Sequence, residues 1–121
     1  MTLLIIAIIA ALTPFAATAA DHVWSLILVD GAEPGYPATL SMDQPGQVYG
    51  RAPCNRYSGS MIGSLPAFRV ETVMSTKMAC SDGEAEQKFF DLLSRIDQAE
   101  QADGMLTLTG AGHELVFSSL P

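Results

Sequence analysis

Most of the chain consists of short apolar stretches that end at glycine or proline, and this spacing constrains the fold more than any other feature. The stretch Val23–Val29 (VWSLILV) is followed by Asp30-Gly31, and Ala38–Met42 (ATLSM) alternates between apolar and polar residues. Alternation with a period of two is typical of a strand with one buried face. Runs bounded by turn residues are typical of strands joined by hairpins. The pattern therefore predicts a mainly β fold.

Turn signals place the hairpins. Pro45-Gly46 supplies the fixed φ and the positive φ of a type II turn, so we expect Gln47–Ala52 to pair back on the preceding strand. In that preceding strand the alternation predicts Ala38, Leu40 and Met42 inward, and Thr39 and Ser41 outward. Further strands are expected at Ala67–Val73, Met105–Thr109 and His113–Phe117, the last two joined by the turn Gly110-Ala111-Gly112.

One segment has a helical period instead. Ser81 and Glu84 have the S-x-x-E spacing of a capping box, which predicts a helix from about Asp82 to Asp97. Its apolar stripe comprises Ala85, Phe89, Leu92, Leu93 and Ile96. No internal repeat is visible. The predicted fold class is α+β, mainly β, with a curved, largely antiparallel, barrel-like sheet and one helix packed on it.

The first twenty residues have the layout of a secretory signal. An apolar run from Leu3 to Leu12 is followed by Pro14 and by small residues that allow cleavage after Ala19 or Ala20. No Lys or Arg precedes the run, and an uncleaved anchor is the alternative, although the run is shorter than the ~20 residues a spanning helix needs. No cysteine forms a lipobox there. The sequence predicts a signal peptide (1–20), one mature domain (21–121), and a periplasmic or secreted location without a stable membrane span.

The charge balance excludes one class of partner. The chain has 13 acidic and 6 basic residues, a net charge of -7. Such a chain repels phosphate backbones and anionic headgroups, which argues against nucleic acid as a partner. Beyond this the charge is uninformative, because moderate acidity is common in exported proteins.

Two cysteines, Cys54 and Cys80, leave three readings open. In an oxidising compartment an even count favours a structural disulfide, which would stabilise a small domain. Two unpaired buried thiols are the alternative, and a reactive cysteine is the third reading. The spacing is not C-x-x-C, and no His lies close by in sequence, so a redox motif and a zinc site are not predicted.

The first cysteine lies in the densest group of functional side chains, APCNRYSG, from Ala52 to Gly59. Pro53 fixes φ, Asn55 tolerates a left-handed conformation or bonds its own backbone, and Gly59 tolerates positive φ. These residues predict a sharp turn between two strands. Arg56 would then be solvated or paired with a carboxylate, and Tyr57 would pack its ring with the hydroxyl at the rim.

A catalytic interpretation explains fewer of the residues. A cysteine nucleophile needs a base within reach, but His22 and His113 have no orienting acid that the sequence fixes. Ser58 and Ser60 do not lie in G-x-S-x-G, and no glycine-rich phosphate loop is present. The methionines Met74 and Met78 are expected to be core filler or half-exposed packing. The sequence predicts no catalytic residue, no metal site and no cofactor.

Four motifs in order resemble those of the META domain family, whose bacterial type is the heat-shock protein HslJ. They are VWSLILVDG, CNRYSG, STKMAC and EAEQKFFDLL, and the resemblance runs from Val23 to about Phe117. The E-x3-F element is Glu86 to Phe90. One departure is Pro53, where the family usually has Gly. The family's signature positions correspond here to Asn55, Arg56, Tyr57, Gly59, Thr76, Met78 and Cys80.

The resemblance implies a small exported or envelope-associated domain linked to stress response, with no established enzymatic activity or cofactor. We therefore expect a non-enzymatic domain of the bacterial envelope that acts in stress tolerance by binding an envelope protein. A binding module for an apolar small molecule or lipid is the alternative. A secreted inhibitor or an enzyme using Cys54 is a third hypothesis. The sequence names neither the partner nor the oligomeric state.

Overall fold

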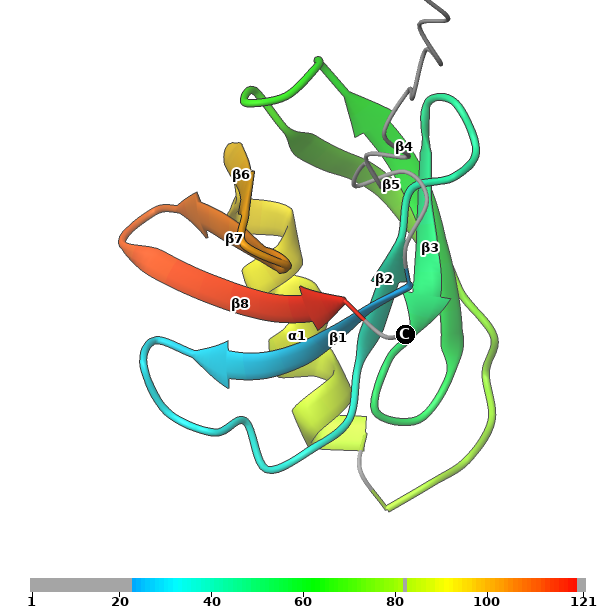
Figure 1. Cartoon of the computed structure of the whole chain (residues 1–121). Helices are drawn as coiled ribbons and strands as arrows, with labels where there is room; N and C mark the ends of the chain where they lie inside the picture. Colours follow the sequence, from blue (N-terminus) through cyan, green and yellow to red (C-terminus); the bar gives the residue numbers. More distant parts are fainter. Residues whose placement is uncertain (1–22, 82, 120–121) are drawn as a thin grey trace, which may run out of the picture.

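In the part of the chain that the structure describes, eight strands form one sheet in which every pairing is antiparallel (Figure 1). The computed structural model describes residues 23–81 and 83–119, so the predicted signal peptide lies outside the described residues. The strand order is β5-β4-β3-β2-β1-β8-β7-β6. The elements are β1 (Val23–Val29), β2 (Thr39–Ser41), β3 (Gln47–Arg51), β4 (Arg56–Ile62), β5 (Arg69–Ser75), α1 (Gly83–Arg95), β6 (Gln98–Ala102), β7 (Met105–Gly110) and β8 (His113–Ser119).

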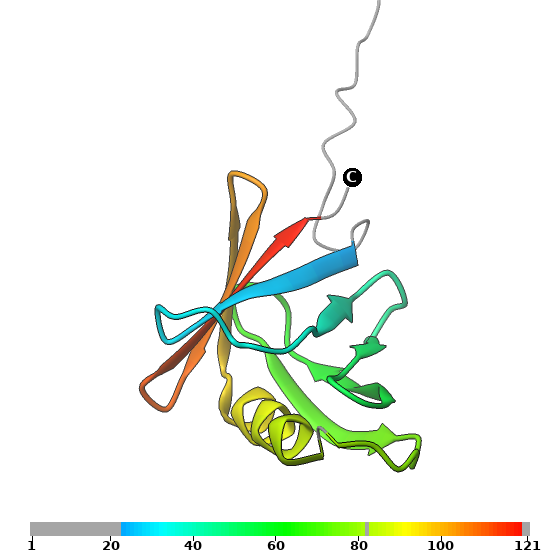
Figure 2. The ribbon, with the colours of Figure 1, turned by 90° about the horizontal axis from the view of Figure 1, so that it is seen from below.

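The sheet curls until its two edge strands approach each other. Ala67, just before β5, forms an isolated antiparallel bridge with Gln98 of β6. Two backbone hydrogen bonds support this approach: Phe68 N donates to Asp97 O (3.1 Å) and Ala99 N donates to Pro66 O (2.9 Å). Helix α1 lies at one end of the curled sheet, beside β5, and the chain leaving it leads into β6 (Figure 2). The predicted α+β, barrel-like fold is confirmed.

Large apolar side chains fill the space between sheet and helix. Trp24, Phe68, Phe89 and Phe117 have no exposed surface. They come from β1, the residue before β5, the helix and β8. Residues from the beginning, middle and end of the described chain therefore contribute to one core. Burial of each such side chain contributes about 1.5–3 kcal/mol. The remaining fully buried side chains are Leu40, Val48, Leu93, Ile96, Leu106, Leu108 and Leu115.

The predicted hairpins are confirmed with adjustments. Gly46 has a φ of 71°, and Gln47 N donates to Gln44 O (3.1 Å), as a type II turn requires. Ala38, Leu40 and Met42 are buried as predicted, but Ser41, expected to face outward, is buried as well. The strand expected at Ala67–Val73 begins two residues later.

Two strands were not predicted: β4, of which the first four residues lie in the segment expected to be a turn, and β6. Strand β6 has the sequence QAEQA, which carries no β-branched or aromatic residue. Such a sequence has low intrinsic β-propensity. It becomes a strand because it pairs along its whole length with β7, from Gln98 opposite Thr109 to Ala102 opposite Met105.

The helix is confirmed, but it ends two residues before the predicted Asp97, and the predicted first residue, Asp82, lies outside the described residues. It runs from Gly83 to Arg95, and within the described residues Ser81 and Glu84 do not make the hydrogen bonds of a capping box. Glu86, two residues after Glu84 and also in the first turn, is the acid that accepts hydrogen bonds from another part of the fold. In the described part of the chain, no helix is long and apolar enough to cross a membrane.

Candidate functional site

Three segments meet at one corner of the molecule: the turn between β3 and β4, the connection from β5 to α1, and the first turn of α1. The sulfurs of Cys54 and Cys80 lie at disulfide-bonding distance there, with their Cα atoms 6.2 Å apart. We call the residues that join these segments the corner cluster: Cys54, Asn55, Thr76, Met78, Cys80 and Glu86. The structure therefore brings together most of the residues that the sequence singled out.

A nearly buried carboxylate, Glu86, holds the β3–β4 turn against the helix. Its Oε1 accepts hydrogen bonds from the backbone N–H groups of Cys54 (3.0 Å) and Asn55 (2.6 Å). Its Oε2 accepts a third from the Asn55 side-chain Nδ2 (2.7 Å). Only 8% of the Glu86 surface is exposed. Hydrogen bonds to an ionised acceptor are shorter and stronger than neutral ones, so this carboxylate is a strong local attachment.

These hydrogen bonds determine the protonation state of Glu86. Burial by itself raises the pKa of the carboxyl, because it disfavours the charged form. The three hydrogen bonds from Asn55 and Cys54 stabilise that charged form and outweigh the burial, so the pKa lies below its ordinary value. Glu86 is therefore ionised at neutral pH.

The amide of Asn55 connects the helix to the β5–α1 connection. Its Oδ1 accepts hydrogen bonds from Thr76 Oγ1 (2.9 Å) and from Met78 N (2.7 Å), while its Nδ2 donates to Glu86. Because donors face the oxygen and an acceptor faces the nitrogen, only one orientation of the amide satisfies the cluster. The sequence predicted that Asn55 would be left-handed or would bond its own backbone, and this was wrong.

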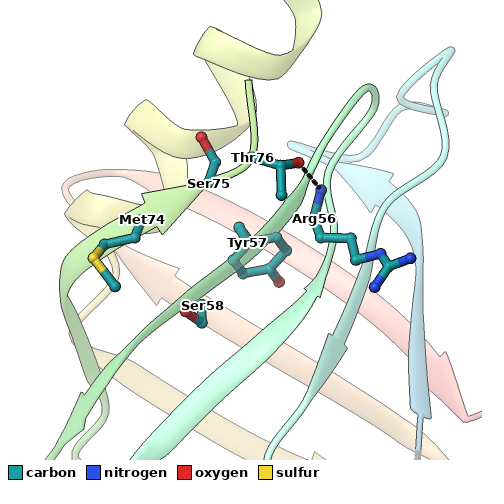
Figure 3. Close-up of a pocket in the computed structure, with 6 residues that line it drawn as sticks. All are labelled: Arg56, Tyr57, Ser58, Met74, Ser75 and Thr76. Carbon is teal, nitrogen blue, oxygen red and sulfur yellow. Dashed lines mark hydrogen bonds between the residues drawn. The ribbon is translucent and has the colours of Figure 1, made fainter. Parts of the chain in front are cut away.

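The corner cluster continues into strands β4 and β5. Arg56 N donates to Thr76 Oγ1 (3.2 Å), and Thr76 N donates to Arg56 O (3.0 Å). Figure 3 shows the first of these bonds, with the Arg56 side chain extending away from it. Thr76 thus pairs with Arg56 through both its backbone N–H and its hydroxyl. Among the described residues, the Arg56 guanidinium makes no hydrogen bond or ion pair with the cluster.

Two signature residues lie inside the barrel and not in the cluster. Tyr57 is 3% exposed, and its hydroxyl donates to Thr39 O (2.7 Å), so the hydroxyl is not at the rim as predicted. Burial raises the pKa of this phenol far above its ordinary value. The Tyr57 ring meets Phe89 and Phe90 edge to face, with centroids 5.6 Å apart in both pairs.

Gly59 is required for space and not for positive φ. Its φ is not positive, which contradicts the predicted reason for the glycine. A Cβ atom there would lie 2.9 Å from Val70 Cγ1 and 3.2 Å from Glu71 O on the neighbouring strand. The sharp turn predicted for Ala52 to Gly59 is confined to the residues before Arg56, where β4 begins.

A shallow hollow of about 340 Å³ lies beside the corner cluster. It is lined by Arg56, Tyr57, Ser58, Met74, Ser75 and Thr76, and Figure 3 shows Met74 and Arg56 on opposite sides of it. Met74 and Met78 are 66% and 57% exposed. The prediction that they would be core filler or half-exposed packing is therefore corrected: both lie largely in solvent.

The polar chemistry of the corner cluster is internally satisfied. Among the described residues, no buried side-chain nitrogen or oxygen lacks a hydrogen-bond partner, and no group of three or more His, Cys, Asp or Glu is placed to hold a metal. His113 Nδ1 lies 2.9 Å from Asp30 Oδ2, far from the cysteines in sequence and on another hairpin. His22 lies outside the described residues.

Sequence reasoning did not single out Glu86 as the centre of the site. It named Glu86 only as the start of the E-x3-F element. That element was the available signal, because an acid four residues before an aromatic residue faces the same side of a helix. The three donors, however, come from residues more than thirty positions earlier, as the separations of 31 and 32 show.

Fold and site together define a class: a small curled antiparallel sheet closed by one helix, with a cysteine-linked corner held by a buried Glu–Asn pair. The model of the META domain family matches residues 17–121, and the chain belongs to this family. The resemblance found in the motifs is thereby confirmed. No curated protein matches the chain.

Two solved structures share the fold. One is an NMR structure of a protein from Burkholderia xenovorans, 26% identical, with a TM-score of 0.67; the match covers 84% of this chain and 83% of that chain. The other is an NMR structure of a protein that is 23% identical, with a TM-score of 0.63, covering 82% of this chain and 89% of that chain. The second likeness concerns the fold alone.

Proposed function

We propose that the chain is an exported, non-enzymatic binding domain of the bacterial envelope that supports stress tolerance. The observation that carries the proposal is the saturation of the corner cluster. The polar side-chain atoms of Glu86, Asn55 and Thr76 make hydrogen bonds to one another and to the backbone. The sulfurs of the two cysteines lie at bonding distance from each other. Side chains whose polar atoms are all hydrogen-bonded within the protein have none left for a partner, and their role is to hold strands β3, β4 and β5 in place. We therefore assign contact with a partner to the outer face of these strands.

Export is supported by the signal-like sequence of residues 1–20 and by the cysteine pair, since disulfides persist in oxidising compartments. In this proposal the Cys54–Cys80 bond forms after export and links the β3–β4 turn to the segment before α1. The stress role comes from the family and is part of the proposal.

Binding of an apolar small molecule or lipid is the second candidate. Its difficulty is that the concave face of the sheet is occupied by α1 and by fully buried aromatic side chains, so an apolar ligand would have to displace them. Native mass spectrometry of freshly purified protein distinguishes the two. A co-purified lipid mass would favour this candidate over a surface contact.

The proposal is tested by complementation. A bacterial host that lacks its own member of the family is given the full chain or a chain without residues 2–20, and survival after heat and envelope stress is measured together with cell fractionation. Only the full chain should reach the periplasm or medium and restore survival. Equal protection by the leaderless chain, or retention of the full chain in the cytoplasm, contradicts the proposal.

A further inference from the structure

Two arginines lie directly opposite each other on adjacent strands of this acidic chain. In the register of β3 and β4, Arg51 pairs with Arg56. The chain has only 6 Lys and Arg residues against 13 acids, so a like-charged pair is an unexpected use of two of them. Like charges directly opposite each other in a sheet are destabilising.

The hydrogen-bond pattern brings the two side chains close. Arg51 N donates to Thr39 Oγ1 (2.9 Å), and Arg56 N donates to Thr76 Oγ1, so both N–H groups point away from the shared ladder. The two residues therefore form a non-hydrogen-bonded pair, the kind in which side chains approach most closely. Cβ atoms in directly opposed pairs are about 4.5–5.5 Å apart.

Both side chains face the outside of the sheet. Arg51 and Arg56 are exposed, whereas their neighbours in the same register, Gly50 and Tyr57, face the interior. Tyr57, which pairs with Gly50, is 3% exposed and marks the inward side of this register position. Alternation along both strands then directs the two guanidinium groups to the same outer surface.

No carboxylate of the described residues neutralises this pair. The ion pairs found there are Arg95–Asp91 and His113–Asp30, and neither Arg51 nor Arg56 has a carboxylate oxygen within 4.0 Å. Asp43, which contacts β3, is engaged by the Tyr49 hydroxyl (2.5 Å). The guanidinium groups of Arg51 and Arg56 are therefore available to an anionic ligand on the outer face of the sheet.

The hollow beside Arg56 adds a hydroxyl donor. Ser58 lines it, two residues along β4 on the same outer face, and its hydroxyl makes no hydrogen bond within the described part of the chain. Two planar guanidinium forks and a hydroxyl suit a tetrahedral oxyanion, which offers oxygen pairs to both forks and a charge that matches theirs.

We propose that Arg51 and Arg56 form a phosphate-binding site, with Ser58 as an additional donor. This names the ligand chemistry for the binding role proposed above and rests on that role. The phosphate group comes either from a small phosphomonoester or from a lipid headgroup. The net charge of -7 opposes approach to an anionic membrane, so the small phosphate is the expected source, and the experiment separates the two.

The purified exported chain is titrated with inorganic phosphate, and with sodium chloride at matched ionic strength, while amide and arginine Nε–H signals are followed by NMR. Phosphate should give saturable shifts at Arg51, Ser58 and Arg56, and chloride should not. Arg51→Gln and Arg56→Gln should each weaken binding at least about tenfold, the loss expected for one charged hydrogen-bonding group. Arg69→Gln, also exposed and without an ion pair, should bind like the wild type.

Three results would overturn the inference: equal shifts with phosphate and chloride, the signature of an adventitious ion only; unchanged affinity in Arg51→Gln and Arg56→Gln; or equal loss in Arg69→Gln. Co-sedimentation with phosphatidylglycerol vesicles, against phosphatidylcholine vesicles as control, identifies the source. Sedimentation that requires both arginines assigns a headgroup, and its absence assigns a small phosphate ligand. If phosphate fails to bind while the full chain still restores survival, the phosphate site is rejected and the proposed envelope function is kept.

Discussion

At the scale of single residues, the corner depends on Glu86, whose ionised carboxylate only accepts hydrogen bonds. Glu86 faces three N–H donors, and the Asn55 amide cannot turn round to offer an oxygen, since that oxygen already accepts from Thr76 and Met78. A neutral amide at position 86 would place an N–H group against another N–H group in either orientation. The site therefore requires the ionised carboxylate of Glu86, and an amide of the same shape cannot replace it.

Glu86→Gln should lower the free energy of unfolding at pH 7 by about 1–3 kcal/mol, because a nearly buried donor loses its acceptor. Chemical denaturation measures this. Glu84→Gln, the same change on an exposed helical neighbour, should cost only about 0.3–1 kcal/mol through the helix dipole. Equal effects of the two changes would show that the hydrogen bonds at Glu86 do not contribute.

The pH dependence should follow from the lowered pKa of Glu86. Because the folded-state pKa lies below the unfolded one, the contribution of Glu86 is fully present above the unfolded pKa and is lost as the pH falls through the folded pKa. Wild-type stability should therefore decline below about pH 4.3, the ordinary range of Glu. In Glu86→Gln this decline should be shallower, and parallel curves for the two proteins would contradict the assignment.

At the scale of elements, the helix is attached to the sheet by two independent contacts. One is polar, at the corner cluster, where Cys54 and Cys80 link the β3–β4 turn to the segment before α1. The other is apolar, where Phe89 packs edge to face against Tyr57 and Tyr36. The β5–α1 connection is itself held at the corner cluster, because Thr76 Oγ1 and Met78 N both donate to Asn55 Oδ1.

Cys54→Ala and Cys80→Ala should each lower stability by about 2–4 kcal/mol, as expected for a bond that closes a loop with a separation of 26 residues. The double variant should be little worse than either single one, because each change removes the same bond. Denaturation of the three variants under oxidising conditions measures this. Additive losses, or two free thiols in a mass measurement of the unreduced protein, would mean that the bond does not form.

Phe89→Ala should lower stability by about 3–5 kcal/mol through a cavity between the helix and the sheet. Phe90→Ala, next to it and only partly buried, is the matched control and should cost less. Thermal and denaturant unfolding compare the two. A loss for Phe89→Ala no greater than that for Phe90→Ala would show that the predicted face of the helix is not the one that carries the core.

At the scale of the whole molecule, closure of the barrel depends on a close backbone approach after the helix. A Cβ atom at Gly110, the last residue of β7, would lie 2.1 Å from Arg95 O, 2.7 Å from Ile96 Cα and 2.8 Å from Asp97 N. All three are backbone atoms, so no side chain can move aside to relieve the contact. The chain leaving α1 therefore crosses β7 at a point where only glycine fits, and it enters β6 from there.

Gly110→Ala should consequently lower stability by about 1–3 kcal/mol or more, the usual cost of overpacking. Gly83→Ala, at the open start of the helix with nothing within 4 Å of the new Cβ, should be neutral or slightly stabilising, since Ala favours helix by about 1 kcal/mol over Gly. Melting temperatures of the two variants test this. A Gly110→Ala protein as stable as the wild type would mean that the crossing is looser than described.

The sequence by itself determined the fold class, the helix, most hairpins and the family. These depend on local signals: period-two alternation in Ala38–Met42, the Pro45-Gly46 turn and the apolar stripe around Phe89. Each of these acts within a few residues, so a reader of the sequence can find it.

Only the tertiary structure decided the rest. Strand β6 forms because β7 offers it a partner, Glu86 becomes the centre of the corner because donors from residues 54 and 55 fold onto it, and Arg51 meets Arg56 only through strand register. The physical reason is common to all three. Hydrogen bonds and charge interactions depend on distance in space. When two residues are far apart in sequence, no local pattern indicates that they will be neighbours in the folded sheet.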